Sequence, residues 1–226
     1  MARLTASELD SRRRLDFAVL KAMDERCDCI SVEAYATASD LRNRHNRITR
    51  REDSHRARHY LILYRIKTLV GAGKFTDQTR IHVDTEVDNY PFQEPASWVI
   101  SETPWSPHFL TGSPVCTGDH WERSGRSLLG HLVRHHAKLL NWDEKARGGG
   151  YQGWNGAAIA WHRKHYGSKP LSEGLRYPEI PVDIAYGLGS PASEDELFGA
   201  TTRTGGRSSR RSTADSELFS RAGRRA

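Results

Sequence analysis

The first hydrophobic pattern in the chain has the period of a helix. Placed on a helical wheel, the apolar residues between positions 7 and 25 gather on one face. This face carries Leu9, Leu15, Val19, Leu20 and Met23. Ser7 precedes them, and a serine hydroxyl can accept a hydrogen bond from a free amide of a first helical turn. We therefore predict a helix from about Ser7 to Glu25.

Four later segments have strand character. Residues 30 to 36 alternate in part, 59 to 70 form a long strand-like run, 80 to 87 alternate regularly, and 98 to 100 are a short apolar run. Regular alternation places the apolar side chains on one face of a strand, where they can pack against a core. We predict that the four segments form an antiparallel sheet.

Helical spacing returns after the strands. Leu128, Leu132, Val133 and the pair at 139 and 140 recur at the helical period within residues 128 to 140. Three glycines at 148 to 150 end that region, and residues 155 to 166 predict a last helix. The chain is thus expected to be α+β, with an N-terminal helix, a four-stranded antiparallel meander, a loop with the candidate active site, and C-terminal helices.

Composition narrows the class of protein. A chain of 226 residues fits one domain with appendages, and 37% hydrophobic residues with a mean hydropathy of −0.70 predict a water-soluble protein. No apolar run reaches the ~18 residues of a membrane span, and the N-terminus lacks the apolar stretch of a secretory signal. Three cysteines are too few for a disulfide framework. We expect a cytoplasmic protein without a membrane anchor.

The net charge of +6 is concentrated in two segments. Residues 42 to 58 hold seven arginines against Glu52 and Asp53, and residues 201 to 226 hold seven against Asp215 and Glu217. Each segment carries +5, so the remainder carries −4. Basicity therefore belongs to a loop and a tail, and the expected core is mildly acidic.

These patterns divide the chain into three parts. Residues 1 to 167 form the expected domain, with the basic loop at 40 to 58 inside it. Residues 168 to 198 contain four prolines and scattered apolar residues, which predicts an extended arm along the domain. Residues 199 to 226, rich in Arg, Ser and Gly, are expected to be disordered because they bury too little apolar surface to offset their ordering entropy. Such a basic tail can bind an acidic partner or a nucleic acid weakly.

The candidate chemistry lies between Tyr90 and Gly118. The segment runs through Tyr90-Pro91-Phe92, a proline at 95, the apolar run at 98 to 100, a loop at 104 to 112, and Pro114-Val115-Cys116-Thr117-Gly118. Glycine and proline around Cys116 favour an exposed loop, where reactive groups are usually presented. The alternative for this cysteine is a buried, inert thiol.

This order of landmarks resembles the core of ubiquitin-conjugating enzymes. Members of that superfamily run from a Tyr-Pro turn through a short strand into a His-Pro-Asn loop and then to the active-site cysteine. The resemblance covers about residues 7 to 166 and implies their fold. His108 stands eight residues before Cys116, where the family usually has asparagine, so the chain resembles a divergent, bacterial-type member.

The resemblance implies a reaction and its partners. Cys116 would carry a ubiquitin-like modifier as a thioester and transfer it to an amine of a target protein. His108 would donate a hydrogen bond to the thioester oxyanion or act as a base toward the amine. An ATP-dependent activating enzyme would have to load the chain, which itself needs no cofactor. Bacterial relatives belong to ubiquitin-like conjugation systems, some of them antiphage. Asn141 and Asp143 are possible positions for residues that assist transfer.

Other candidate sites have ordinary interpretations. His131 with His135, and Cys116 with His120, are spaced four residues apart, but no complete ligand set follows and we predict no metal site. Cys27 and Cys29 could chelate or oxidise, although half-buried small residues are the default interpretation. Four tryptophans are expected in the core and at its edges rather than in a ligand platform. These are Trp121, Trp142, Trp154 and Trp161.

Two rival functions stay open. A cysteine hydrolase would use Cys116 with His131 or His135 as the base, and it would need that imidazole within hydrogen-bond reach of the sulfur. A nucleic-acid-binding protein would use the two arginine segments, and its binding would depend steeply on salt.

Overall fold

The computed structural model describes residues 3–118, 120–143 and 155–186. Its first element is α1 (Ala6–Arg26), whose cap, Thr5, lies two residues before the expected cap, Ser7. Thr5 and Glu8 form a reciprocal capping box: the Thr5 hydroxyl accepts the Glu8 amide at 3.3 Å, and the Thr5 amide donates to Glu8 Oε2 at 2.7 Å. The capping box gives the Glu8 amide of the first turn a hydrogen-bond acceptor, and Ser7 therefore lies inside the helix and does not cap it.

The four predicted strands do form one antiparallel sheet. Its members are β1 (Ile30–Tyr35), β2 (His59–Tyr64), β5 (Thr79–Asp84) and β6 (Ala96–Val99), in the order β1-β2-β5-β6. Every neighbouring pair is antiparallel, which confirms the four-stranded sheet after an N-terminal helix. The description α+β therefore holds.

The prediction of one strand over residues 59 to 70 was wrong. β2 ends at Tyr64, and the chain then makes a separate hairpin from β3 (Thr68–Gly71) and β4 (Lys74–Thr76). The Arg65 amide donates to Cys29 O before β1 begins, so the pairing of the two strands runs out there. Apolar residues continue along the chain beyond Tyr64, the last residue of β2 that pairs in the sheet. The apolar pattern alone therefore could not show where β2 ends.

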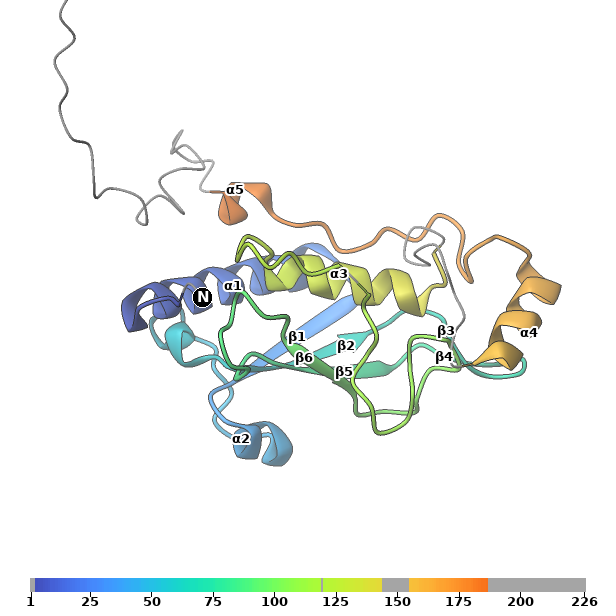
Figure 1. The fold of residues 1–226 in the computed structure, drawn as a ribbon, viewed down its shortest axis with the longest axis horizontal. Coiled ribbons are helices and arrows are strands. Elements are labelled where there is room, and N and C mark those ends of the chain that lie inside the picture. Colours follow the sequence, from blue (N-terminus) through green and yellow to red (C-terminus); the bar gives the residue numbers. More distant parts are fainter. Residues whose placement is uncertain (1–2, 119, 144–154, 187–226) are drawn as a thin grey trace, which may run out of the picture. The chain divides into compact units, whose positions relative to one another are not determined.

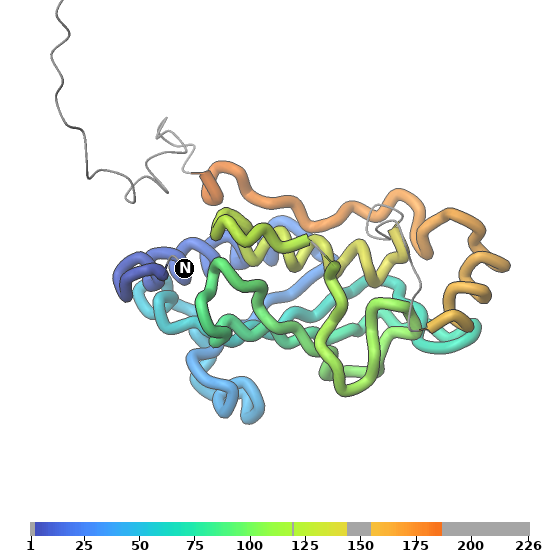
Figure 2. The backbone as a smooth tube through the Cα atoms, in the orientation of Figure 1, coloured from blue at the N-terminus to red at the C-terminus, as the bar shows by residue number. Residues whose placement is uncertain are grey.

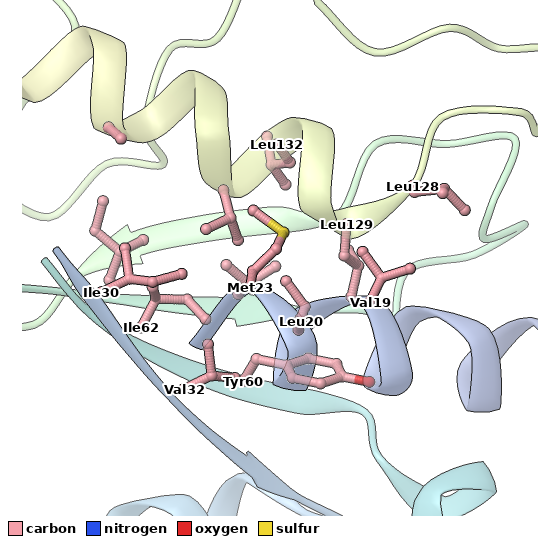
Figure 3. Close-up of a cluster of buried hydrophobic side chains, with 14 of the residues drawn as sticks. Val19, Leu20, Met23, Ile30, Val32, Tyr60, Ile62, Leu128, Leu129 and Leu132 are labelled. Carbon is pink, nitrogen blue, oxygen red and sulfur yellow. The ribbon is translucent and has the colours of Figure 1, made fainter. Parts of the chain in front are cut away.

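The core lies between one face of the sheet and two helices, α1 and α3 (Leu129–Leu140) (Figure 1). Alternation turns Tyr60 and Ile62 of β2 toward this layer. In Figure 3, Val19, Leu20 and Met23 of α1 lie among the strand residues and the α3 leucines. The short helix α2 (Ala38–Asn43) covers the opposite face, where Leu41 packs with Tyr35 and Leu61.

The remaining elements lie around this core. The 3-10 helix η1 (Glu52–Arg56) lies in the basic loop, and α4 (Gly156–Tyr166) packs near the β3–β4 hairpin in a second apolar cluster. After α4 the chain returns over α3 with little regular structure until α5 (Val182–Ala185), as Figure 2 shows. Leu175, Tyr177 and Ile180 of this segment pack on the core. The rest of the expected arm, at 187–198, and the expected tail lie outside the described residues.

A buried ionic network fixes α1 to the second half of the domain. Asp16 accepts hydrogen bonds from Arg12 Nε at 2.6 Å, from the Leu129 amide at 3.0 Å and from the Tyr90 hydroxyl. Arg12 also donates to the carbonyls of Gly125 and Ser127. Asp16 is only 1% exposed, so the surrounding donors are what make its charge tolerable. The network joins α1, the Tyr-Pro turn and the start of α3.

Among the described helices, none combines the length and the apolar character needed to cross a membrane.

Candidate active site

Cys116 lies in a loop that returns along the edge of β6. The Val115 amide donates to Ser97 O of β6 at 2.8 Å, which sets the loop beside the sheet. At the other end of the loop, the Trp105 amide donates to Leu69 O of β3 at 2.7 Å. Cys116 is the free cysteine of the chain and is half-buried.

His108 and Cys116 are brought together by two hydrogen bonds. The Cys116 amide donates to His108 O at 2.9 Å, and His108 Nδ1 lies 2.7 Å from Cys116 O. Because a carbonyl only accepts, Nδ1 carries the proton and Nε2 is the acceptor nitrogen of the neutral ring. Burial lowers the pKa of His108, opposed by the bond to Cys116 O, so the ring is neutral at pH 7.

The residue after the cysteine is held from two further directions. The Thr117 hydroxyl donates to Glu94 Oε1, and His135 Nε2 of α3 lies 3.1 Å from Thr117 O. Burial raises the pKa of Glu94, while the Thr117 hydrogen bond acts to lower it. Contacts from β6, the preceding loop and α3 thus fix the backbone at three successive positions, 115 to 117.

A group of neutral imidazoles lies on the α3 side of this loop. The rings of His120 and His135 stack at 3.9 Å between centroids, and His120 Nε2 lies 3.2 Å from His131 O. Burial, followed by repulsion from His120 and His108, lowers the pKa of His135 to about 4. Burial likewise lowers the pKa of His136 to about 3. These rings therefore contribute hydrogen bonds and packing at neutral pH, and no positive charge.

The two histidines considered as a hydrolase base are engaged elsewhere. His135 Nε2 is directed at Thr117 O, and His131 Nδ1 accepts the Leu128 amide at 3.2 Å at the start of α3. In the part of the chain that the structure describes, neither ring makes a hydrogen bond to Cys116 Sγ. The arrangement needed for a cysteine–histidine hydrolase pair is not formed by these residues.

Asn141 and Asp143 contact the segment that follows α4. Asn141 is 1% exposed, and its amide exchanges hydrogen bonds with the backbone of Ser172 and with Tyr177. Asp143 also interacts with Tyr177. Both residues hold the returning segment against the end of α3, a structural task that their sequence position did not reveal.

The two remaining cysteines and three of the tryptophans of the sequence analysis have structural positions. Cys27 and Cys29 are half-buried, as expected, but they are joined in a disulfide, which the sequence interpretation had set aside. Trp121 and Trp142 are buried, and Trp161 packs with the second apolar cluster. Trp154 lies outside the described residues.

The basic loop encloses a pocket of about 470 Å³. Arg47, Arg50 and Arg56 line it together with Asp40 and Asp53. The two carboxylates reduce the positive potential there. The arginines of this segment therefore form a mixed surface rather than a continuous basic strip.

Sequence reasoning did not find Glu94 or the contact of His135 with the loop. Glu94 stands two residues after the Tyr-Pro-Phe turn, and an acidic residue before a proline carries no signal of its own. His135 was noted for its spacing from His131, whereas its actual partner is the carbonyl of Thr117. The Glu94 contact depends on how the Tyr-Pro turn meets the loop, and the His135 contact depends on how α3 packs against it.

No protein family, curated protein or solved structure matched the chain in any of the three comparisons.

Proposed function

We propose that the chain is a ubiquitin-conjugating-enzyme-like protein that carries a ubiquitin-like modifier as a thioester on Cys116. The observation that carries the proposal is the reciprocal pair of hydrogen bonds between Cys116 and His108. It fixes the backbone of a half-buried cysteine at a sheet edge, in the loop where the resemblance to conjugating enzymes is concentrated.

The chemistry needs little more than that. A thiolate attacks the carbonyl carbon of a modifier that is already a thioester on an activating enzyme. A new C–S bond forms as the old one breaks, and the activating enzyme's thiolate leaves. A target amine then attacks the thioester on Cys116; the amide forms, the Cys116 thiolate leaves, and the amine loses its proton to water or a base. ATP is consumed by the activating partner.

His108 would serve this reaction chiefly by position. Its Nδ1–H is committed to Cys116 O, so this ring atom holds the loop as an asparagine amide could. Nε2 is an acceptor in this tautomer, so it is suited to receive a proton rather than to donate to an oxyanion. The base role expected from the resemblance is thus compatible with the ring, and the donor role would require a second proton on it.

The arrangement of elements supports the finer description of the fold. An N-terminal helix, a four-stranded antiparallel sheet, a cysteine loop beside the last strand and a following helix occur in the order that conjugating enzymes show. A bacterial ubiquitin-like conjugation system, of the class in which some members act against phage, is the setting we propose. Its members would be the modifier, the activating enzyme and the target protein.

A loading assay tests the proposal. The full chain is incubated with an activating enzyme, ATP and a ubiquitin-like modifier, and intact mass is measured with and without a reducing agent. A thiol-labile adduct should form on the wild type and on the Cys27→Ser/Cys29→Ser variant, and should be absent from Cys116→Ala. An activating enzyme that is itself charged but never transfers to Cys116 would contradict the proposal for that pair.

A second candidate is the binding of nucleic acid by the basic loop, whose Arg47, Arg50 and Arg56 line a pocket together with two carboxylates. Such binding should weaken steeply as salt is raised, because each phosphate contact releases counterions. It should survive Cys116→Ala and be weakened by Arg50→Ala. Binding that is insensitive to both salt and Arg50 would remove this candidate.

A further inference from the structure

A group of metal-binding side chains lies at the end of the β2–β5 pair, separate from Cys116. His59, the first residue of β2, is paired in register with Asp84, the last residue of β5. Glu86 follows two residues later. Since Tyr60 and Ile62 face the core under α1 and α3, His59 faces the opposite side of the sheet.

The distances in this group are those of a coordination site. His59 Nδ1 lies 3.4 Å from Asp84 Oδ1, and His59 Nε2 lies 3.1 Å from Glu86 Oε2. One ligand atom from each of the three residues can be chosen so that all lie within 4.8 Å of one another. Ligand atoms at about 2.0–2.2 Å from a tetrahedral zinc ion lie roughly 3.3–3.6 Å apart. Small rotations of the side chains would therefore suffice to close a site.

A fourth donor adjoins the three. His82 Nε2, on β5, lies 3.2 Å from His59 Nδ1. Two imidazoles and two carboxylates thus converge on one end of the strand pair.

Both ring nitrogens of His59 have close partners. A neutral imidazole has one N–H and one lone pair. Nε2 of His59 lies 3.1 Å from Glu86 Oε2, and Nδ1 lies 3.2 Å from His82 Nε2, so without an ion His59 can donate to Glu86 and accept from His82. His59 is only 1% exposed, so these partners replace water around the ring. A metal ion here would take the place of the Nε2 proton, beside the carboxylates of Glu86 and Asp84.

We propose that one ring nitrogen of His59, together with Asp84 and Glu86, binds a divalent metal ion of the zinc class. Imidazole and carboxylate together suit zinc among the common divalent ions. With Nε2 on the ion beside Glu86, Nδ1–H can donate to His82 Nε2, a contact of the kind that orients a metal-bound histidine through its other ring nitrogen. Glu86 is half exposed, which gives the ion a path from solvent.

The bound ion would connect the start of β2 with the segment at and after the end of β5. It would join the first residue of β2 to the end of β5 and to the segment that leads into the Tyr-Pro turn. The Thr85 amide and hydroxyl already donate to Arg58 O at this point, each at 2.9 Å. Metal binding would strengthen the same connection, and it is independent of thioester formation on Cys116.

Isothermal titration of the full chain, stripped with a chelator and then given Zn²⁺, tests the site. We expect one ion per chain, and we expect Glu86→Gln or Asp84→Asn to weaken binding at least ~10-fold. The matched controls Glu102→Gln and His45→Gln should bind as the wild type does. Glu86 is exposed enough that its variant should fold even if a His59 variant does not.

A cobalt titration distinguishes this site from the cysteines. Co²⁺ bound by nitrogen and oxygen gives ligand-field bands without the near-ultraviolet charge-transfer band of a thiolate ligand, and the spectrum should be unchanged in Cys116→Ala. A thiolate band that vanishes in Cys116→Ala, or binding that is unaffected by Glu86→Gln and Asp84→Asn, would overturn the proposal. Absence of metal binding would overturn the proposal as well.

Discussion

The ring nitrogen Nδ1 of His108 lies 2.7 Å from the carbonyl oxygen of Cys116, while the amide of Cys116 donates to the carbonyl oxygen of His108 at 2.9 Å. Two residues eight positions apart therefore clamp the loop that carries the sulfur. One of the two bonds is made by backbone alone, so substitution of His108 removes only the other. The hydrogen bond from His108 Nδ1 to Cys116 O can thus be tested while the backbone hydrogen bond still holds the loop.

We predict that His108→Ala slows loading of Cys116 about fivefold, and that His108→Asn stays within about twofold of wild type. Loss of one hydrogen bond costs about 1 kcal/mol, and the asparagine amide can still donate to Cys116 O. Loading rates measured from single-turnover gels would show this, with thermal melting to establish that both variants are folded.

A pH profile of modifier discharge separates positioning from base catalysis. Burial keeps the pKa of His108 below its usual value, so the ring does not change charge between pH 7 and 9. If His108 only positions the loop, wild type and His108→Asn should show parallel profiles. An asparagine variant that loads normally but discharges slowly at every pH would instead identify His108 as the base.

Stability should fall as pH is lowered from 7 to 5, because of His135 and His136. Burial lowers their pKa values to about 4 and about 3 in the folded protein, whereas an unfolded chain binds protons near 6.5. Between those values the unfolded state holds more protons, so their contribution is complete above pH 6.5 and is lost as pH falls. We expect a loss on the order of 2 kcal/mol by pH 5, allowing for the partial solvation of His135.

Urea unfolding at pH 7 and pH 5 measures this loss. His135→Gln should make the free energy of unfolding less dependent on pH, since glutamine does not titrate. His45→Gln changes an exposed histidine and should leave the dependence as in wild type. Equal pH dependence in all three proteins would contradict the assignment to His135.

Asp16→Asn should be among the most destabilising single substitutions in the domain. It leaves Arg12, which is 7% exposed, without its counter-charge, and breaking a buried ion pair from one side costs about 3–5 kcal/mol. Tyr90→Phe removes one donor to Asp16 and should cost about 1–3 kcal/mol.

The matched control for Asp16 is Asp10→Asn on the same helix. Asp10 makes a longer, 3.8 Å ion pair with Arg13 and is 46% exposed, so its loss should cost less than ~1 kcal/mol. Chemical denaturation of the three variants would compare them. If Asp16→Asn is no worse than Asp10→Asn, the network is not what joins α1 to α3.

The elements that followed a clear period were predicted from sequence. The helical face of α1 and the alternation of β5 each depend on neighbouring residues, so local pattern was sufficient. The end of β2 at Tyr64 was not predictable in this way, because it is set by where β1 stops offering partners. The hairpin that follows uses the same kinds of apolar residue as the strand itself.

In the candidate site too, local features were predictable from sequence and contacts between distant segments were not. Cys116 and His108 stand close in sequence, in a loop with a recognisable composition. Contacts of Glu94 and His135 with Thr117 join a turn, a loop and a helix that are far apart in the sequence, so they exist only in the folded domain. The group at His59 likewise depends on strand register, which pairs His59 with Asp84 across the sheet.

Gly130→Ala should destabilise the protein although alanine is the better helix former. A Cβ at Gly130 on α3 would lie 2.8 Å from Val19 Cγ1 and 2.9 Å from Met23 Sδ on α1. The helix preference gains about 1 kcal/mol, while overpacking of a close contact costs about 1–3 kcal/mol. The expected net loss is up to about 2 kcal/mol, read from urea unfolding.

Gly156→Ala provides the contrast to Gly130→Ala. Gly156 is the first residue of α4, and a Cβ there meets nothing within 4 Å, so only the helix preference changes. Alanine at 156 should therefore be neutral or slightly stabilising. If both alanine variants were stabilised equally, α1 and α3 could not approach as closely as the contacts of Gly130 require. Where Gly130→Ala destabilises as expected, the double variant Gly130→Ala/Val19→Ala should lose less stability than the two single variants added together, since removing the Val19 methyls opens the space that the new Cβ needs.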